Sequence, residues 1–218
     1  MNPTFEYERK LWGRGYRFVG GADEVGRGAF AGPVVAAVVV FDPLNTTWPE
    51  EVLVRDSKKL TPKDREISSL WIKSNTYWGI GEVGVSVINQ KGMGKATQSA
   101  FRRAVSEVHY HLPKKMEHLL IDAFFVSYIK GLARPRQTPL IKGDEASCSI
   151  AAASIIAKVH RDGIMKNLSK KFKKYSWSTN AGYGTAEHRN AILAHGVTPQ
   201  HRRNYLTKLF ASQGRSDA

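Results

Sequence analysis

The chain of 218 residues carries 33 basic and 19 acidic side chains, so its formal net charge is +14. This length predicts one large domain with a full hydrophobic core, and an apolar content of 42% excludes a disordered polymer. A positive field of this size favours a polyanionic partner, with nucleic acid as the first candidate. The alternative is that the charge serves only solubility.

The single cysteine, Cys148, excludes an internal disulfide framework and is typical of a reducing compartment. The longest apolar run, residues 34–41, is too short to cross a bilayer, and no targeting signal is recognisable. We therefore expect a soluble, cytoplasmic protein with no membrane partner. Nothing in the sequence demands a partner chain, so a monomer is expected.

Apolar spacing and turn residues predict the secondary structure along the chain. In chain order, the expected elements are a helix over 5–15, strands over 17–23 and 33–41, a helix over 62–75, a strand over 77–85, a helix over 94–112, strands over 118–122 and 138–142, and helices over 149–168 and 185–195. A basic loop is expected over 170–176 and 179–183, and a disordered tail over 214–218. This order indicates a mixed α/β sheet with helices on its faces, and C-terminal helices over the substrate face.

Residues 20–41 contain the most informative motif of the chain. Asp23 and Glu24 end an apolar strand, and the turn Gly26-Arg27-Gly28 separates them from a second, β-branched strand. Carboxylates where two buried strands meet are costly unless a cation compensates them, which makes metal binding the first hypothesis. Neighbours on a strand point to opposite faces, so both acids reach one site only if the chain bends at the glycine turn.

Two further acids, Asp122 and Asp144, follow short apolar strands. Ligands gather at strand ends in such sheets, so these two acids and Asp23 are candidates to converge. Converging carboxylates repel one another, a divalent ion relieves the repulsion, and oxygen-only ligands favour Mg²⁺ or Mn²⁺. Two ions about 3.5–4 Å apart form a clamp for phosphodiester hydrolysis. A single aspartate at a strand end is more often a turn-former than a ligand. Three such acids in a basic chain make the metal site and the turn-forming role about equally favoured, and spacing does not decide between them.

Six blocks of the sequence resemble bacterial type 2 ribonuclease H, the ribonuclease HII family, and they follow the family's order across nearly the whole chain. The blocks are GADEVGRGAFAGPVVAA (21–37), DSKKL (56–60), LLIDAF (119–124), KGDEASCSIAAASIIAKVHRD (142–162), GYGTAEH (182–188) and HGVTPQHRRNY (195–205). The combination of DE-x-GRG-x-x-AGP with DSKKL and AAASIIAK is highly specific to this family.

The resemblance implies a ribonuclease H-like α/β fold: a central five-stranded mixed sheet, flanking helices and a C-terminal helical part at about 165–206. We expect a single catalytic domain over 1–206 and a tail over 207–218. The implied activity is metal-dependent cleavage of RNA paired with DNA, including 5′ of single ribonucleotides embedded in duplex DNA. The implied products carry 3′-hydroxyl and 5′-phosphate ends, and the implied cofactor is Mg²⁺ or Mn²⁺, two per site.

Carried over by position, Asp23, Glu24, Asp122 and Asp144 are similar to the family's metal-binding acids. The turn Gly26-Arg27-Gly28 is similar to the element that reads the 2′-hydroxyl at the ribo–deoxyribo junction. Glycines let the backbone approach a ribose closely, and the arginine adds a charge suited to phosphate.

Tyr183 is similar to the family's tyrosine that stacks on the sugar beyond the scissile bond, and its glycine neighbours argue against a core role. Lys58, Lys59 and the basic cluster 170–174 are expected to contact the phosphate backbone, and residues 201–205 add a third basic segment. Separately, the histidines at 188 and 195 are expected to face solvent or cap a helix.

Two departures and two alternatives stay open. Glu145 beside Asp144 is unusual for the family and leaves some ambiguity about which acid reaches the metal, although family position favours Asp144. One alternative is a catalytically silent nucleic-acid-binding relative, against which the presence of all four acids speaks. The other is a type 3-like ribonuclease H preferring long RNA tracts, against which Arg27 argues. The second departure is the pair Ala29-Phe30, where proline and a smaller aliphatic residue are expected.

Overall fold

A five-stranded mixed sheet forms the centre of the molecule, as predicted. The computed structural model describes residues 2–211, so the predicted disordered tail over 214–218 lies outside the described residues. The strands are β1 Val19–Val25, β2 Val34–Val40, β3 Tyr77–Val83, β4 His118–Asp122 and β5 Gln137–Leu140. Their order in the sheet is β3-β2-β1-β4-β5. Strand β2 pairs antiparallel with both β1 and β3, whereas β4 pairs parallel with both β1 and β5.

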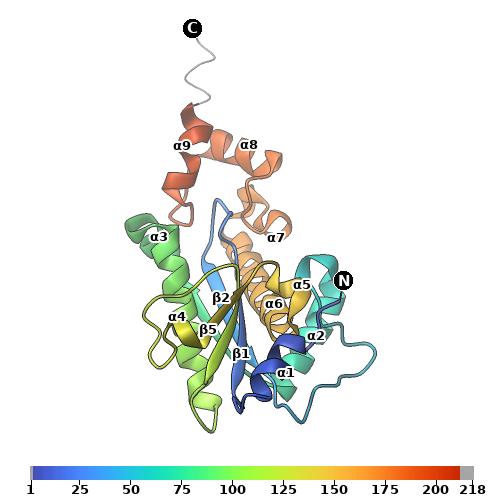
Figure 1. Cartoon of the computed structure of the whole chain (residues 1–218). Coiled ribbons are helices and arrows are strands. Elements are labelled where there is room, and N and C mark those ends of the chain that lie inside the picture. Colours follow the sequence, from blue (N-terminus) through green and yellow to red (C-terminus); the bar gives the residue numbers. More distant parts are fainter. Residues whose placement is uncertain (1, 212–218) are drawn as a thin grey trace.

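Helices cover both faces of this sheet (Figure 1). On one face lie α3 Val85–Lys91 and α4 Met93–His111; on the other lie α1 Glu6–Trp12, α2 Pro62–Asn75 and α6 Cys148–Lys171. All seven residues of β2, VVAAVVV, are buried, and alternate side chains enter two separate cores. A strand buried on both faces reads as a continuous apolar run, which explains why this strand was predictable.

The helix α6 lies unusually close to β1. A Cβ atom built on Gly21 would lie 2.2 Å from the backbone carbon of Ser149, so only glycine fits there. The small side chains Ala151, Ala152 and Ala153 of α6 are fully buried. This close approach brings the middle of α6 alongside the acidic end of β1.

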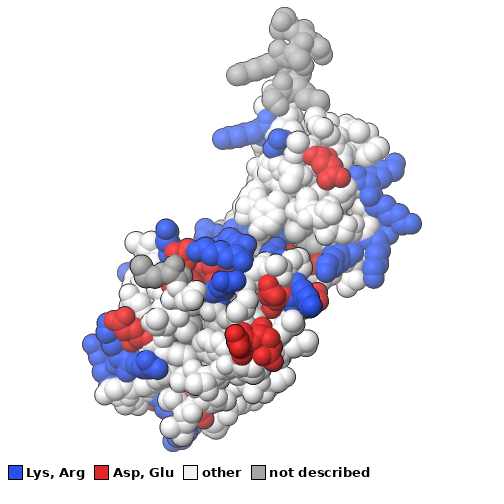
Figure 2. Space-filling model, turned by 90° about the vertical axis from the view of Figure 1, so that its right-hand side faces the viewer, with Lys and Arg blue, Asp and Glu red and all other residues white. Residues whose placement is uncertain are grey.

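Short helices extend the chain beyond one end of the sheet. The C-terminal part contains α7 Trp177–Asn180, α8 Ala186–His195 and α9 Arg203–Ala211, and it lies above the sheet in Figure 1. It has a small core of its own, in which Trp177, Ile192 and Leu206 pack with Ala31 and Met165. The outline narrows between this part and the sheet body, and Lys and Arg side chains lie on both sides of the narrowing (Figure 2).

Several predicted boundaries differ from the observed ones. The strand predicted over 138–142 covers 137–140 and is followed by the short helix α5 Gly143–Ala146. The predicted strand over 77–85 ends at Val83, because α3 begins at Val85. The predicted basic loop over 170–176 contains the end of α6 and a 3₁₀ turn at 173–175, and α7 overlaps the predicted loop over 179–183 at residues 179 and 180. Two further 3₁₀ turns lie at 57–59 and 134–136. Helix α9 continues past the predicted domain limit at 206, and 212–218 lie outside the described residues.

Within residues 2–211, no helix combines the length and the apolar character that crossing a bilayer requires.

Candidate active site

A cavity of about 480 Å³ lies where β1 and β4 end and the C-terminal part begins. Its lining combines acidic, basic, hydroxyl and aromatic side chains from five segments of the chain. The lining residues are Asp23, Glu24, Val25, Gly26, Arg27, Ser57, Lys58, Asp122, Ser154, Lys158 and Tyr183. Three of the four predicted acids therefore share one cavity with two residues of the glycine turn and with the predicted stacking tyrosine.

The parallel pairing of β1 with β4 explains why Asp23 and Asp122 come together. Ala22 pairs with Ile121, so the next residue of each strand is an aspartate at the same edge of the sheet. The Asp23 side chain is 6% exposed, and its Oδ1 accepts a hydrogen bond of 2.7 Å from the N–H of Glu24. Asp122 Oδ1 accepts a hydrogen bond of 2.8 Å from the N–H of Gly143.

Glu24 reaches the same cavity as Asp23 although the two are neighbours on β1. The strand ends one residue later, and Gly26 has a φ of +91° that turns the chain away. Glu24 Oε1 lies 3.3 Å from a guanidinium nitrogen of Arg27, whereas its buried Oε2 has no hydrogen-bond partner. The bend required by the sequence argument is therefore present at the glycine turn.

The fourth acid, Asp144, was expected at a strand end and instead lies in the first turn of α5. Its side chain is buried, and it does not line the cavity directly. Lys58 connects it to the cavity, because the Lys58 ammonium lies 3.5 Å from Asp144 Oδ2 and 3.8 Å from Asp56 Oδ1. The structure thus brings three acids together at the cavity and the fourth to its margin.

The electrostatics of these acids are unfavourable as they stand. Burial, together with the charge of Glu24, raises the pKa of Asp23 to about 8. Burial also raises the pKa of Glu24, opposed by Arg27, and the pKa of Asp144, opposed by Lys58. A bound cation would offset the repulsion between these carboxylates and the cost of burying their charge.

The candidate ligands suit a hard divalent cation, but they do not already surround a common position. Every candidate ligand is a carboxylate oxygen, which suits Mg²⁺ or Mn²⁺, and the unpaired Glu24 Oε2 is available as a donor. Within residues 2–211, no group of three or more histidine, cysteine, aspartate or glutamate side chains already forms a metal-binding cluster. Lys58 supplies the positive charge nearest to Asp144.

The turn at residues 26–28 and Tyr183 meet beneath one buried arginine. A Cβ atom on Gly26 would lie 2.1 Å from Arg161 Nε, whereas a Cβ atom on Gly28 would meet nothing within 4 Å. The Arg161 guanidinium carbon lies 5.5 Å from the centre of the Tyr183 ring. Glycine is thus demanded by the protein itself at position 26, and position 28 leaves open space beside the cavity.

The predicted phosphate-binding lysines are both engaged with acids. Lys58 lines the cavity and contacts Asp56 and Asp144 as described, and Lys59 is exposed and lies 2.8 Å from Glu145 Oε1. Glu145 is therefore paired outside the cavity rather than beside the other acids. Residues 170, 171, 173 and 174 of the basic cluster are all exposed lysines.

The structure corrects two predictions about individual side chains and shows the partner of one further acid. His188 was expected to face solvent or cap a helix, but its side chain is fully buried and its Nε2 accepts a hydrogen bond of 2.9 Å from Trp177 Nε1. The basic segment 201–205 does not lie wholly at the surface, because His201 and Arg202 are buried. Asp162 pairs with Lys158, at 2.8 Å, and not with its neighbour Arg161.

Sequence reasoning missed several residues of the cavity. Ser154 lines the cavity together with Asp23, and its hydroxyl lies 2.9 Å from the hydroxyl of Ser57. Ser154 and Lys158 are four residues apart on α6, so they lie on one face of that helix. This four-residue spacing was the signal that could have identified them, within the block 142–162 that was quoted for its family resemblance.

Comparison with known proteins connects this site to one family. A sequence model described as Ribonuclease HII matches residues 20–208. The chain is 42% identical over 207 residues to the ribonuclease HII of Synechococcus sp. (strain JA-3-3Ab), covering 94% of this chain and 89% of that one. It is likewise 42% identical to the ribonuclease HII of Thermosynechococcus vestitus, covering 98% and 95%.

Solved structures share the fold at lower sequence identity. The ribonuclease H2 of Pyrococcus horikoshii OT3 superposes with a TM-score of 0.72 at 24% identity, covering 91% of this chain and 100% of that chain. The structure of Bst-RNase HIII in complex with Mn²⁺ gives a TM-score of 0.72 at 24% identity, covering 91% and 70%. The arrangement of sheet and helices is therefore that of the ribonuclease H fold.

Proposed function

Because the chain belongs to the ribonuclease HII family and is thus a ribonuclease H endonuclease, we propose that it cleaves the RNA strand of RNA/DNA hybrids and cuts 5′ of ribonucleotides embedded in duplex DNA. Its products would carry 3′-hydroxyl and 5′-phosphate ends, and it would act in ribonucleotide removal during DNA replication and repair. The observation that carries the proposal is the shared cavity, in which three carboxylates meet Gly26, Arg27 and Tyr183.

Asp23, Glu24, Asp122 and Asp144 are the proposed ligands of two divalent ions, Mg²⁺ or Mn²⁺. Support comes from the oxygen-only donor set, the unpaired Glu24 Oε2 and the raised pKa values of three of these acids. A protein of the same fold, Bst-RNase HIII, was solved in complex with Mn²⁺. Bound divalent ions supply the positive charge that makes water acidic and stabilises the departing oxygen of a phosphodiester.

The chain's own residues orient these acids. The N–H of Glu24 donates a hydrogen bond to Asp23, and the N–H of Gly143 donates one to Asp122. In both aspartates the bonded atom is Oδ1. Such support lowers the cost of drawing the acids together around an ion, because their side chains are already ordered.

The turn and the tyrosine are the proposed means of recognising the ribose. The open space at Gly28 lets the backbone approach a sugar, whose 2′-hydroxyl is both a donor and an acceptor. Tyr183 would stack on the sugar beyond the scissile bond, and Arg27 would contact phosphate. The 2′-hydroxyl serves recognition rather than attack, so no cyclic phosphate should form.

Basic side chains around the cavity are the proposed phosphate contacts. Lys58 lines the cavity, Lys59 is exposed next to it in sequence, and the exposed lysines of the cluster 170–174 flank Phe172, which packs against the core of the C-terminal part. Charge of this kind binds duplexes without regard to sequence. The monomeric state, the cytoplasmic location and the domain limits stay predictions from the sequence.

The test is cleavage of a DNA duplex that contains one ribonucleotide, with Mg²⁺ or Mn²⁺ and with EDTA. We expect a single cut 5′ of the ribonucleotide in the presence of metal and none with EDTA. Asp23→Asn should abolish cleavage with duplex binding nearly unchanged, and Asp42→Asn, at a half-buried acid that does not line the cavity, should leave cleavage intact. An active Asp23→Asn enzyme would refute the metal assignment, and cleavage confined to long RNA tracts would favour the type 3-like alternative.

A further inference from the structure

Two arginines are completely buried between the sheet body and the C-terminal part. Arg161 on α6 and Arg202 just before α9 are both 0% exposed. The acid next to Arg161 in sequence, Asp162, pairs with Lys158 instead. A buried charge is costly unless hydrogen bonds compensate it, so the partners of these guanidinium groups must be found elsewhere.

All the partners but one are backbone carbonyl groups of the segment 26–33; the exception is the carbonyl of Ala181, which Arg161 engages. Arg202 donates to the carbonyls of Gly26 (2.6 Å), Arg27 (3.0 Å) and Ala29 (2.8 Å) through one nitrogen. Its other nitrogens donate to the carbonyls of residues 32 and 33 at 2.8–3.0 Å. Charged donors form the stronger class of hydrogen bond, so one side chain fixes the carbonyl groups along the whole turn.

Arg161 links the same turn to the loop that carries Tyr183. Its guanidinium donates to the carbonyls of Pro33 (2.9 Å), Ala31 (3.0 Å) and Ala181 (3.0 Å), and it lies over the Tyr183 ring. Its Nε occupies the space that a side chain at position 26 would need. The turn and the tyrosine are thus held by one planar group.

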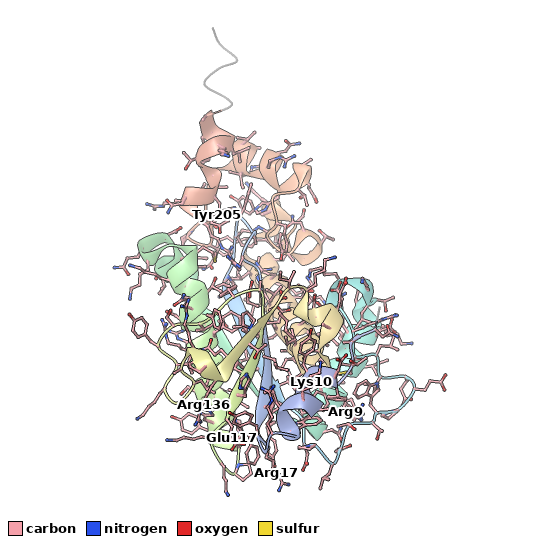
Figure 3. All side chains as sticks on the ribbon, viewed as in Figure 1. Arg9, Lys10, Arg17, Glu117, Arg136 and Tyr205 are labelled. Atoms are coloured by element: carbon pink, nitrogen blue, oxygen red, sulfur yellow. The ribbon has the colours of Figure 1, made fainter. Side chains whose placement is uncertain are left out.

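Contacts from the C-terminal part complete this arrangement. The N–H of Arg202 donates to the carbonyl of Phe30 at 2.8 Å, and the ring of Tyr205 lies 5.7 Å from the Arg202 guanidinium carbon. In Figure 3, Tyr205 lies between α9 and the sheet body, whereas Arg17 and Glu117 lie at the opposite end of the sheet. The C-terminal part therefore reaches the ribose-reading turn through Arg202.

The amide groups of the turn are in a different position from its carbonyls. Within residues 2–211, the N–H groups of Arg27 and Gly28 have no hydrogen-bond acceptor, whereas the carbonyls of Gly26 and Arg27 are both engaged by Arg202. A peptide unit whose carbonyl is fixed on one side directs its N–H to the other. The N–H groups of Arg27 and Gly28 are therefore available to donate hydrogen bonds to a sugar oxygen.

We propose that Arg161 and Arg202 are positioning residues for ribose recognition: they hold the carbonyls of the 26–33 turn, so that the N–H groups of Arg27 and Gly28 are left as donors to the 2′-oxygen. This inference rests on the proposed function and extends it to residues that touch no substrate. Lysine keeps the charge but lacks the planar fork, so it cannot hold the same set of carbonyls.

The experiment compares Arg202→Lys and Arg161→Lys with the wild type. Arg102→Lys is the matched control, because Arg102 also donates to a backbone carbonyl, that of Ser127 at 3.0 Å, but on α4 away from the cavity. Fluorescence anisotropy in EDTA gives the Kd for a duplex with one ribonucleotide and for the all-DNA duplex of the same sequence. The readout is the Kd for the all-DNA duplex divided by the Kd for the ribonucleotide-containing duplex, a ratio that a merely structural contact would not change.

We expect each variant to lower this ratio about tenfold, the value of roughly one hydrogen bond, while the Kd for all-DNA duplex stays within about twofold. The control should keep the wild-type ratio. A folded Arg202→Lys protein with an unchanged ratio overturns the positioning role. A wild type that does not distinguish the two duplexes contradicts the proposed function itself, so the two failures are distinguishable.

A measurement on the wild type covers the case in which a variant fails to fold. Hydrogen exchange of the Arg27 and Gly28 amides should slow when the ribonucleotide-containing duplex binds and should not slow with the all-DNA duplex. Equal protection by both duplexes, or no protection by either, overturns the proposal without any substitution.

Discussion

Replacing Asp23 by asparagine should stabilise the metal-free protein. Burial, with a further contribution from the charge of Glu24, raises the pKa of Asp23 to about 8, whereas a solvated aspartate carboxyl has an ordinary pKa of 3.8. Because the folded pKa is raised, the ionised carboxylate opposes folding at every pH above about 4. The roughly three pH units between 4 and 7, at about 1.4 kcal/mol each, amount to about 4 kcal/mol at pH 7.

Asparagine removes this cost and keeps the local contacts. Its amide oxygen can accept the hydrogen bond that the Glu24 N–H now donates to Asp23 at 2.7 Å. The variant should therefore unfold with a free energy about 4 kcal/mol higher than the wild type at pH 7 in EDTA, and the difference should fall to about 0.6 kcal/mol at pH 4, where the carboxyl is protonated in the folded state and about half protonated in the unfolded state. Mg²⁺ should narrow the difference, because it stabilises the folded wild type more than the variant.

Urea unfolding followed by tryptophan fluorescence measures these differences, at pH 7 and pH 4 and with EDTA or Mg²⁺. Asp42→Asn serves as the control and should change the unfolding free energy by no more than about 0.5 kcal/mol. Equal stability of Asp23→Asn and wild type at pH 7 in EDTA would refute the reasoning. A difference as large at pH 4 as at pH 7 would show that it arises from packing and not from ionisation.

Three other predictions test separate parts of the structure. Tyr183→Ala should lower cleavage at a single ribonucleotide about tenfold or more, the value of a lost stacking contact, with metal affinity unchanged; equal loss of both would contradict the stacking role. Gly21→Ala should destabilise the protein in thermal unfolding, because its Cβ would lie 2.2 Å from the α6 backbone. Gly163→Ala within α6 is the control: its Cβ would meet nothing within 4 Å, and it should stabilise the protein by about 1 kcal/mol. A Gly21→Ala protein of normal stability would show that the close approach is absent. Burial lowers the pKa of His201 to about 4, so the unfolded state takes up a proton at higher pH than the folded state does. The free energy of unfolding of the wild type should therefore fall by about 3 kcal/mol as the pH falls from 6.5 to 4. His201→Gln should lack this part of the pH dependence and His195→Gln should retain it; identical stability profiles for all three proteins would exclude the effect.

Elements with strong local signals were predicted well. Helix α2 begins where Thr61 and Pro62 indicated, and the Thr61 side chain accepts a hydrogen bond from the N–H of Asp64. Helix α8 begins after Thr185, whose side chain accepts from the N–H of His188, and ends before Gly196. These boundaries depend on contacts within three or four residues, which a sequence pattern contains in full.

The position of Asp144 depends on a longer-range contact, and its prediction was less accurate. Lys142 adopts a left-handed conformation with a φ of +54°, which ends β5 early and starts α5 at Gly143. The N–H of Gly143 then binds Asp122, the last residue of the neighbouring strand. An apolar run followed by glycine and an acid does not reveal this interaction, because the partner is supplied by another strand.

Burial of Arg161 and Arg202 could not be read from the sequence, since basic residues are normally exposed and a run of them indicates a solvated surface. Here the counterpart is backbone carbonyl groups, and carbonyls leave no signature in the side-chain pattern. Arg202 is buried while Arg203 beside it is exposed, so a single basic run divides between interior and surface. The buried guanidinium is costly, and replacing it with an apolar side chain would leave several carbonyls without a donor. Its presence next to the turn that meets the cavity is most simply explained by the geometry it gives that turn, which is the property that the lysine variants measure.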